Sequence, residues 1–340
     1  MPKRTYPKKI LYWSVAVLIL VGIAEIGLRI AGDMYVRQKF SNVQWAIESS
    51  GLKTAHTNNN TASGKTGQKE PTNIIALGES STAGLWVDRP QSYPAQLEVL
   101  LQKRYPEKTI RVFVPLHVGQ NTSQVANRIE QHIATYDPKL IILMVGYNNE
   151  WSLSESHITR FVTGWSFDSL RVKALVTLDE SRLFRVMRYA LLRVVVGGSE
   201  YVKQLRNQSY VLGGVHLVRY PAGKWVFSFA RNHRAQFIDL WRYDVGMIID
   251  SAKARSIPVV LMTYHINPTY LPPEEFGRMA REKNTPLVHN DESFQPLIES
   301  GEIREYVFAR DRWHPNEKGY ERIARNVFDV IVGRALLHEL

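Results

Sequence analysis

The sequence contains no cysteine among its 340 residues. This absence excludes disulfide bonds, a thiolate nucleophile and a cysteine-ligated metal, although it leaves the compartment open. Covalent catalysis by this chain would have to use an oxygen or nitrogen nucleophile. The sequence also has no internal repeat of solenoid or propeller period, which excludes the common repeat architectures.

Several widespread catalytic motifs are absent as well. The nucleophile turn G-x-S-x-G would need glycine where Thr82 stands. A P-loop needs a Gly-Lys pair, and "GESSTAG" at 78–84 contains no lysine. The ten histidines include no H-E-x-x-H or comparable spacing. We therefore expect neither a metal ion nor an organic cofactor.

An apolar stretch at residues 10–32, beginning "ILYWSVAVLILVGIA", is long enough to cross a bilayer, which takes roughly 20 residues. Glu25 and Arg29 interrupt it four residues apart, so we expect them to pair near the far interface. A cleaved signal peptide is the alternative, but "GLRIAG" lacks a small-x-small cleavage site. We expect an uncleaved anchor whose partner is the lipid bilayer.

The tail at residues 1–9 predicts the orientation of this anchor. Its basic residues are Lys3, Arg4, Lys8 and Lys9. Basic residues favour the cytoplasmic side, so the rest of the chain would lie across the membrane. The expected location is the bacterial inner membrane, crossed once, with the main domain periplasmic or extracellular. A juxtamembrane segment and flexible linker, residues 33–72, would join the two parts.

Residues 73–340 alternate apolar runs with helical patterns, which predicts an α/β domain. Uninterrupted runs of Ile, Val and Leu are typical of parallel strands covered on both faces, so the expected architecture is a three-layer sandwich with a central parallel sheet. The clearest expected strands are 73–78, 110–119, 140–146 and 257–265.

Polar residues follow these strands, at the sheet edge where α/β proteins gather their chemistry. Ser80 follows the first strand, Gly119 the second and Asn148 the third, while Asp311 and His314 precede the last helix. A serine attacks only when a base takes its proton, and a carboxylate can orient that base. Backbone N–H groups near a glycine and a side-chain amide suit a developing oxyanion. Alternatively, Gly119 only permits a tight turn and Asn148 only caps one.

The ordered set "GES", "GQNTS", "GYNN" and "DRWHP" resembles the four blocks of the SGNH (GDSL-type) hydrolases, a flavodoxin-like family. The resemblance covers about 73–150 and 236–330. It implies that Ser80 is the nucleophile and lends its own N–H to an oxyanion hole completed by Gly119 and Asn148. It also implies that Asp311 orients His314, which deprotonates Ser80.

Two positions depart from the family pattern. Glu79 and Asn149 both stand where the family usually has aspartate. Neither position carries the core chemistry, so the resemblance still implies an active enzyme.

A basic insertion at about 160–235 has no place in the simple family plan. It holds 13 Lys/Arg against 4 Asp/Glu, a net charge of +9 out of +11 for the chain. Within it, "SRLFRVMRYALLRVVV" at 181–196 predicts a helix with arginines on one side and apolar residues on the other. This helix either docks on the sheet and leaves its arginines in water, or forms a lid or wall that meets anionic lipid, an acidic polysaccharide or a partner protein. Nucleic acid is not expected, because no recognition motif accompanies the charge.

These patterns favour a membrane-anchored serine esterase or O-acyltransferase acting on an acylated envelope glycan or lipid. The alternative is an SGNH-like domain that serves as a structural or assembly subunit of a larger membrane complex. In that case the insertion 160–235 and the anchor would contact a membrane-protein partner.

Overall fold

The computed structural model describes residues 6–49, 71–115, 119–187, 228–309 and 312–337. Its centre is a parallel sheet with the strand order β2-β1-β3-β4-β5. The strands are β1 (Thr72–Gly78), β2 (Ile110–Phe113), β3 (Leu140–Met144), β4 (Val259–Met262) and β5 (Leu287–Val288). The predicted parallel α/β sheet is therefore confirmed.

The middle of the sheet forms the core of the domain. Every residue of β1, β3 and β4 is buried. Ile74 lies beside Val112 on one neighbour and beside Leu140 on the other. A strand buried on both faces needs apolar residues at successive positions, which is why these runs do not alternate with polar residues.

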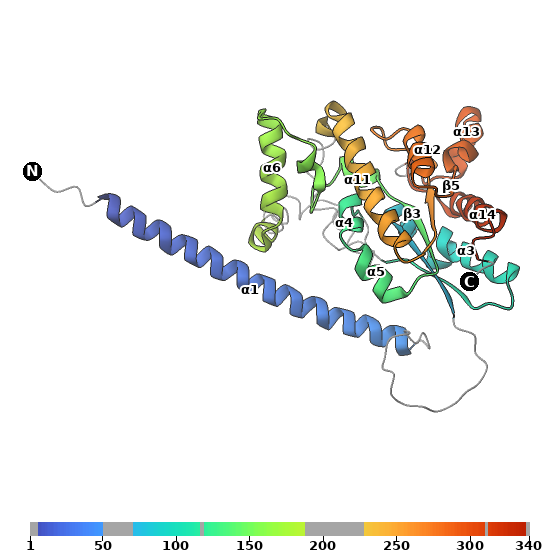
Figure 1. Ribbon diagram of the computed structural model, residues 1–340, viewed down its shortest axis with the longest axis horizontal. Coiled ribbons are helices and arrows are strands. Elements are labelled where there is room, and N and C mark those ends of the chain that lie inside the picture. Colours follow the sequence, from blue (N-terminus) through green and yellow to red (C-terminus); the bar gives the residue numbers. More distant parts are fainter. Residues whose placement is uncertain (1–5, 50–70, 116–118, 188–227, 310–311, 338–340) are drawn as a thin grey trace, which may run out of the picture.

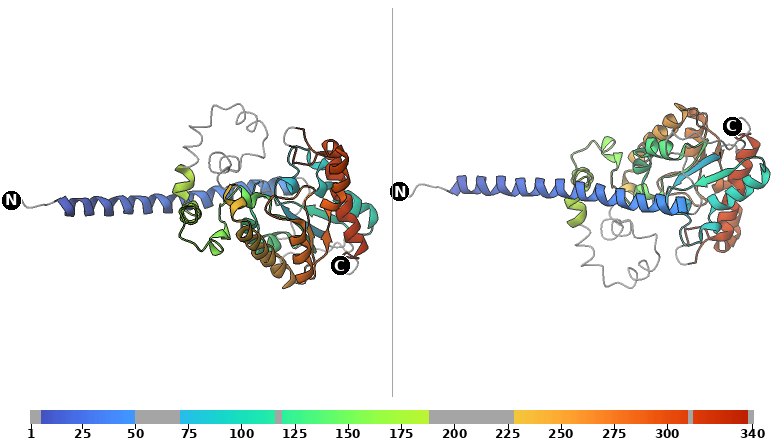
Figure 2. Two further views of the ribbon diagram at one scale, coloured as in Figure 1. Left: turned by 90° about the horizontal axis from the view of Figure 1, so that it is seen from above. Right: turned by 90° about the horizontal axis from the view of Figure 1, so that it is seen from below.

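Helices cover both faces of the sheet (Figures 1 and 2). On one face α3 (Tyr93–Arg104) packs against α14 (Glu317–Gly333), which is joined by α13 (Asn290–Ser300). The other face carries α4 (Thr122–Ala126), α5 (Ile129–Tyr136), α11 (Arg234–Lys253) and α12 (Pro273–Glu282). This arrangement is the three-layer sandwich that the sequence predicts.

The chain reverses direction across the sheet at β1. Strand β2 pairs on one side of β1, and the chain then crosses to β3 on the other side. Ligands of open α/β sheets bind at the carboxyl ends of the strands where such a reversal occurs. The turns after β1 and β3 are therefore the place to look for a site.

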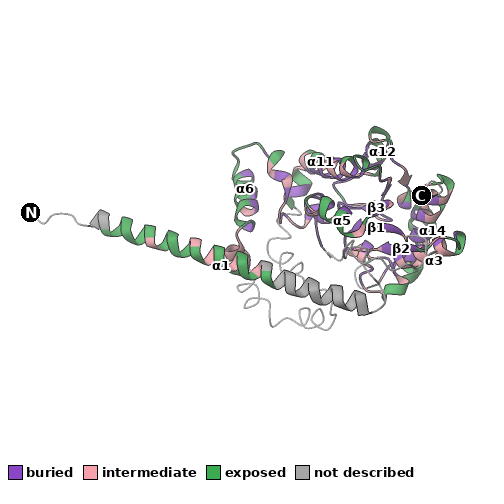
Figure 3. Ribbon diagram, turned by 60° about the horizontal axis from the view of Figure 1, so that its bottom comes forward, coloured by how far each residue is buried: buried purple, intermediate pink, exposed green. Residues whose placement is uncertain are grey.

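An apolar helix, α1 (Tyr6–Ser49), precedes the domain and projects well beyond it (Figures 1 and 3). Its segment Lys9–Gly32 is long and apolar enough to cross a membrane, and none of that segment is buried in the protein. The helix continues past residue 32, where the expected span ends. Most of the expected linker, residues 50–70, lies outside the described residues.

Part of the basic insertion is described. It contains α6 (Phe167–Asp179) and a helical segment at 182–187. The latter is the first part of the helix expected at 181–196, whose remainder falls in 188–227, outside the described residues.

Candidate active site

Ser80 lies at a sharp turn between the central strand and a short helix. β1 ends at Gly78, and Ser80 is the first residue of α2 (Ser80–Ala83). A Cβ atom at Gly78 would come within 1.9 Å of Thr82 Oγ1 and 2.8 Å of the Met144 carbonyl oxygen. Only glycine fits so close a turn, and this turn brings Ser80 to the carboxyl edge of the sheet.

The Ser80 hydroxyl contacts His314 across 234 residues of sequence. Ser80 Oγ lies 2.8 Å from His314 Nε2, and both residues are half-buried. This distance is within hydrogen-bond reach for proton transfer from an alcohol to an imidazole. The predicted pairing of serine and histidine is present in the structure.

The loop that carries His314 is held from both ends. The His314 carbonyl accepts a hydrogen bond from Phe308 N–H at 3.0 Å, and Asn316 caps α14 by accepting from Gly319 N–H at 3.2 Å. His265, buried at the end of β4, donates from Nε2 to the Trp313 carbonyl at 2.7 Å. His265 thus supports the residue next to His314.

Asp311, the expected partner of His314, lies outside the described residues. The role of Asp311 therefore stays a prediction from the Asp-x-x-His spacing.

The turns that contain Gly119 and Asn148 are joined to the Ser80 turn by hydrogen bonds. Gly119 is buried with φ of +78°, a conformation that favours glycine. The neighbouring Gln120 donates from Nε2 to the Gly78 carbonyl at 2.6 Å, and Asn148 donates from Nδ2 to the Gln120 carbonyl at 3.3 Å. The ends of β1, β2 and β3 are thus joined by hydrogen bonds.

Glu79, adjacent to Ser80, is a buried carboxyl group at the centre of this junction. Its Oε1 accepts from Gly146 N–H at 2.7 Å and from Asn148 N–H at 3.4 Å. Burial raises its pKa to about 8, even though the backbone hydrogen bonds and the Tyr264 hydroxyl act in the opposite direction. Sequence reasoning assigned this position no core chemistry; the structure shows that it ties the Ser80 turn to the turn after β3.

Asn149 is the other departure from the family pattern, and it too joins two turns. Its Oδ1 accepts from Thr122 N–H at 2.9 Å. The Thr122 hydroxyl and that of Ser123 donate to the fully buried Asp244 on α11, at 2.5 and 2.7 Å. The other oxygen of Asp244 lies 2.6 Å from His157 Nδ1. Nothing in the sequence pattern linked Asp244 or His157 to the site.

Two features of the described residues bear on ligand binding, namely a surface hollow near the candidate site and the spacing of the side chains that could bind a metal ion. An open hollow near the turn after β3 is lined by Arg231, Arg234, Thr269 and Tyr270, and Tyr270 donates to the Gly146 carbonyl at 2.7 Å. Within the described part of the chain, no three His, Asp or Glu side chains are grouped so that they could hold a metal ion.

Comparison with protein families gives a match over most of the chain. The model of the GDSL-like lipase/acylhydrolase family matches residues 76–322. No curated protein matches the sequence.

Solved structures of similar fold include TesA, which is 18% identical with a TM-score of 0.42 over 78% of this chain and 100% of its own. The psychrotrophic esterase EstA from Pseudoalteromonas sp. is 15% identical with a TM-score of 0.43, over 78% of this chain and 98% of its own. The acetylxylan esterase Axe2 from Geobacillus stearothermophilus is 16% identical with a TM-score of 0.44, over 78% and 96%.

Proposed function

Because the chain belongs to the GDSL-like lipase/acylhydrolase family, we propose that it is a membrane-anchored serine esterase or O-acyltransferase with Ser80 as nucleophile. One observation carries the proposal, namely the 2.8 Å separation of Ser80 Oγ and His314 Nε2. A serine next to a base is the minimal arrangement for acyl transfer.

The proposed reaction has two halves. Ser80 Oγ attacks the ester carbonyl carbon while His314 Nε2 takes the hydroxyl proton. The N–H groups of Ser80 and Gly119 and the Asn148 amide stabilise the oxyanion. When the tetrahedral intermediate collapses, the bond from carbon to the alcohol oxygen breaks, and His314 gives its proton to the leaving alcohol. Asp311 keeps the imidazole oriented throughout.

In the second half, water or a sugar hydroxyl attacks the acyl-enzyme. His314 removes the proton of this acceptor, and Ser80 recovers a proton as it leaves. Hydrolysis and transfer share the acyl-enzyme, so the acceptor alone separates an esterase from an acyltransferase. The substrate class that we propose is an acyl ester of an envelope glycan or lipid. The candidate span Lys9–Gly32 supports this choice because it would keep the domain at a membrane.

The test is to treat the full chain with a fluorophosphonate probe and to assay hydrolysis of p-nitrophenyl acetate. Ser80→Ala should abolish labelling and lower kcat by at least about a thousandfold. Ser81→Ala is the matched control, because it removes the neighbouring hydroxyl of the same turn and should leave labelling intact.

If a folded wild-type chain takes no label and hydrolyses no ester, the catalytic proposal is wrong. The alternative of a structural or assembly subunit would then be favoured. In that case a stoichiometric membrane-protein partner should remain bound to the chain after mild detergent extraction.

A further inference from the structure

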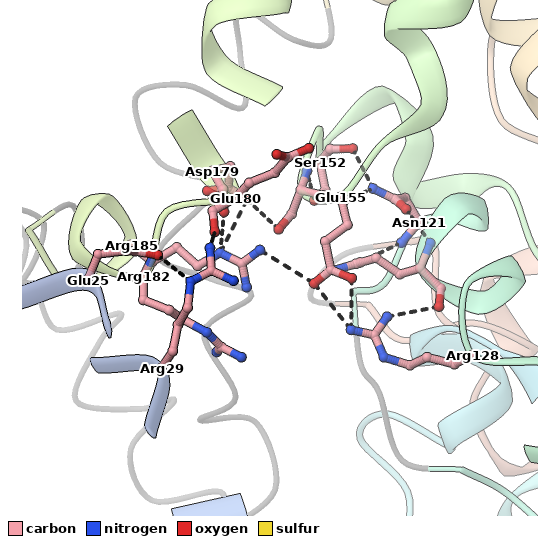
Figure 4. Close-up of polar contacts among 12 residues, drawn as sticks. Glu25, Arg29, Asn121, Arg128, Ser152, Glu155, Asp179, Glu180, Arg182 and Arg185 are labelled. Carbon is pink, nitrogen blue, oxygen red and sulfur yellow. Dashed lines mark hydrogen bonds and ion pairs between the residues drawn. The ribbon is translucent and has the colours of Figure 1, made fainter. Parts of the chain in front are cut away.

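The carboxyl group of Glu25, near the end of the candidate span, caps a helical segment of the insertion (Figure 4). Its Oε1 accepts from Arg182 N–H at 2.9 Å. Its Oε2 accepts from Leu183 N–H and from the Ser181 hydroxyl, both at 2.9 Å. The first N–H groups of a helix have no partner within that helix, and a carboxylate is well suited to satisfy them. The carboxylate of Glu25 in an apolar helix therefore has specific partners in the domain.

Arg29 completes this contact. Its Nε donates to Glu25 Oε1 at 2.8 Å, which confirms the expected pairing, and its Nη2 donates to the Glu180 carbonyl at 3.2 Å. One turn farther along α1, a Cβ atom at Gly32 would lie 3.9 Å from Cζ of Arg182, so this guanidinium group is close to α1. The end of the candidate span is thus joined to residues 180–183 by several hydrogen bonds.

The same part of the insertion is tied to the turns of the candidate active site. Arg185 lies 3.6 Å from Glu155, which also pairs with Arg128 at 2.9 Å. Asn121, two residues after Gly119, donates to the Ser154 carbonyl at 2.8 Å. Figure 4 shows these polar contacts running from α1 toward the turn after β2. The orientation of α1 is therefore coupled to the rest of the domain.

Helix α6 presents an apolar stripe to the outside. Phe167, Leu170, Ala174 and Leu178 recur at intervals that place them on one face, which they share with Arg171, and all five residues are exposed. The opposite face is the buried one, with Val172 and Val176 turned inward. A helix that contacts only water on one side normally carries polar residues there, so a second apolar face indicates a second apolar surrounding.

Exposed apolar side chains are concentrated near this stripe. Outside α1, the described residues include nine exposed large apolar side chains, and six of them fall within residues 165–187. The most exposed are Trp165 at 84% and Phe167 at 79%. Scattered single apolar residues are normal on a protein surface, whereas a cluster of this kind marks an interaction surface.

The position of α6 relative to α1 indicates what covers the stripe. Figures 1 and 2 show α6 crossing the direction of α1, and Asp179 at its end directly precedes the residues that Glu25 and Arg29 hold. The candidate span projects beyond α6 on the side away from the sheet (Figure 3). If α1 crosses a bilayer, a helix that lies crosswise at the end of its span lies in the plane of the membrane surface.

We propose that the apolar face of α6 (Phe167, Leu170, Ala174 and Leu178), together with Trp165, rests in the head-group boundary of the bilayer that α1 crosses. The Glu25 cap sets the height of the domain above that bilayer. Arg171, which lies on the same exposed face of α6, is then placed to meet anionic head groups. This inference rests on the membrane anchoring of the proposed function and is independent of its catalytic part.

The absence of cysteine makes a direct test simple. Phe167→Cys and Leu170→Cys would be introduced singly into the full chain, labelled with an environment-sensitive fluorophore, and reconstituted into phosphatidylethanolamine–phosphatidylglycerol vesicles. These vesicles would contain lipid with a nitroxide near the top of the acyl chain. Val99→Cys, at an exposed apolar position on α3 outside the insertion, is the matched control.

The nitroxide lipid should quench the fluorophores at 167 and 170 at least about twofold more than the fluorophore at 99. Equal quenching at all three positions would overturn the proposal. Protection from aqueous iodide without quenching by the lipid would overturn it too, because a protein rather than lipid would then cover α6.

Glu25→Ala, combined with Phe167→Cys, tests the role of the cap. It should reduce the lipid quenching at 167 toward the value at 99, because the domain loses its fixed height. Unchanged quenching would show that Glu25 does not set this height. Hydrolysis of p-nitrophenyl acetate by the wild-type chain keeps the two proposals separate: selective quenching without any turnover would sink the catalytic proposal and leave this one standing.

Discussion

The carboxyl group of Glu79 makes the stability of the domain depend on pH. Burial raises its pKa from 4.5 to about 8. A carboxyl group with a higher pKa in the folded chain binds more protons when folded, so its contribution to stability is complete below about pH 4.5 and is lost as the pH rises through about 8. Glu79 thus favours unfolding under alkaline conditions.

Glu79→Gln should remove this effect, because glutamine retains an acceptor oxygen for Gly146 N–H and does not ionise. In the wild-type chain, ionisation of Glu79 should lower the free energy of unfolding by up to about 1.4 kcal/mol per pH unit between about pH 4.5 and 8. In the Glu79→Gln variant this decrease should be absent. Denaturant unfolding of the full chain in detergent, followed by tryptophan fluorescence at several pH values, measures the change. Glu302→Gln, at an exposed glutamate, is the control. A variant at Glu79 with the wild-type slope would contradict the prediction.

Asn148 is the residue at which oxyanion stabilisation can be tested separately from the nucleophile. Its amide has two N–H bonds, of which one donates to the Gln120 carbonyl. Asn148→Ala should lower kcat by about 100- to 1,000-fold with a smaller effect on KM, as for the loss of one oxyanion donor. Steady-state kinetics on p-nitrophenyl acetate measure this, with Asn127→Ala at an exposed site as control. An unchanged kcat would exclude Asn148 from the oxyanion hole.

At the level of single elements, the first turn of α14 allows a matched pair of substitutions. A Cβ atom at Gly319 would come within 2.2 Å of the Tyr306 carbonyl oxygen, whereas one at Gly333 in the same helix would meet nothing within 4 Å. Gly319→Ala should therefore destabilise the domain by about 2 kcal/mol or more, and Gly333→Ala by less than about 1 kcal/mol in either direction.

Thermal unfolding of the two variants checks this difference. Gly319→Ala should also slow ester hydrolysis, because Tyr306 precedes the loop that carries His314. Equal melting temperatures of the two variants would contradict the close approach of α14 to the Tyr306 carbonyl.

The long elements were predictable because each has one strong pattern. The apolar runs of β1, β3 and β4 indicate buried strands wherever they occur. β5 contains only Leu287 and Val288, too few residues to form a pattern. The exact start of α14 depends on its cap: the helix begins at Glu317 because the Asn316 side chain accepts a hydrogen bond from Gly319 N–H.

The candidate site was predictable only where family blocks carry it. The predicted residues lie in short polar sequence blocks that follow strands or precede the last helix, namely Ser80, Gly119, Asn148 and His314. Asp244 looks like any acidic residue of a helix, and its contacts with Ser123 and His157 bridge 121 and 87 residues of sequence. The burial of Glu79 depends on how separate turns of the chain meet, so the sequence alone does not reveal it.

At the level of the whole molecule, the orientation in the membrane gives a further prediction. The basic tail predicts that the N-terminus stays in the cytoplasm. In cells with a permeabilised outer membrane, an impermeant maleimide should label Val99→Cys, whereas Thr5→Cys should be labelled only after lysis of the inner membrane. The wild-type chain lacks cysteine and so serves as the blank. The reverse pattern of labelling would overturn the proposed topology.

The separation of Ser80 and His314 by 234 residues has a consequence for biosynthesis. The central strand and the serine turn leave the ribosome early, while the histidine arrives only with the last helix, α14, which must pack on α3 from the first part of the domain. A chain that is still being made therefore holds its serine without its base. The proposed enzyme would gain its reactivity only when synthesis and folding are complete, so a truncated product that ends before residue 314 would hydrolyse no ester.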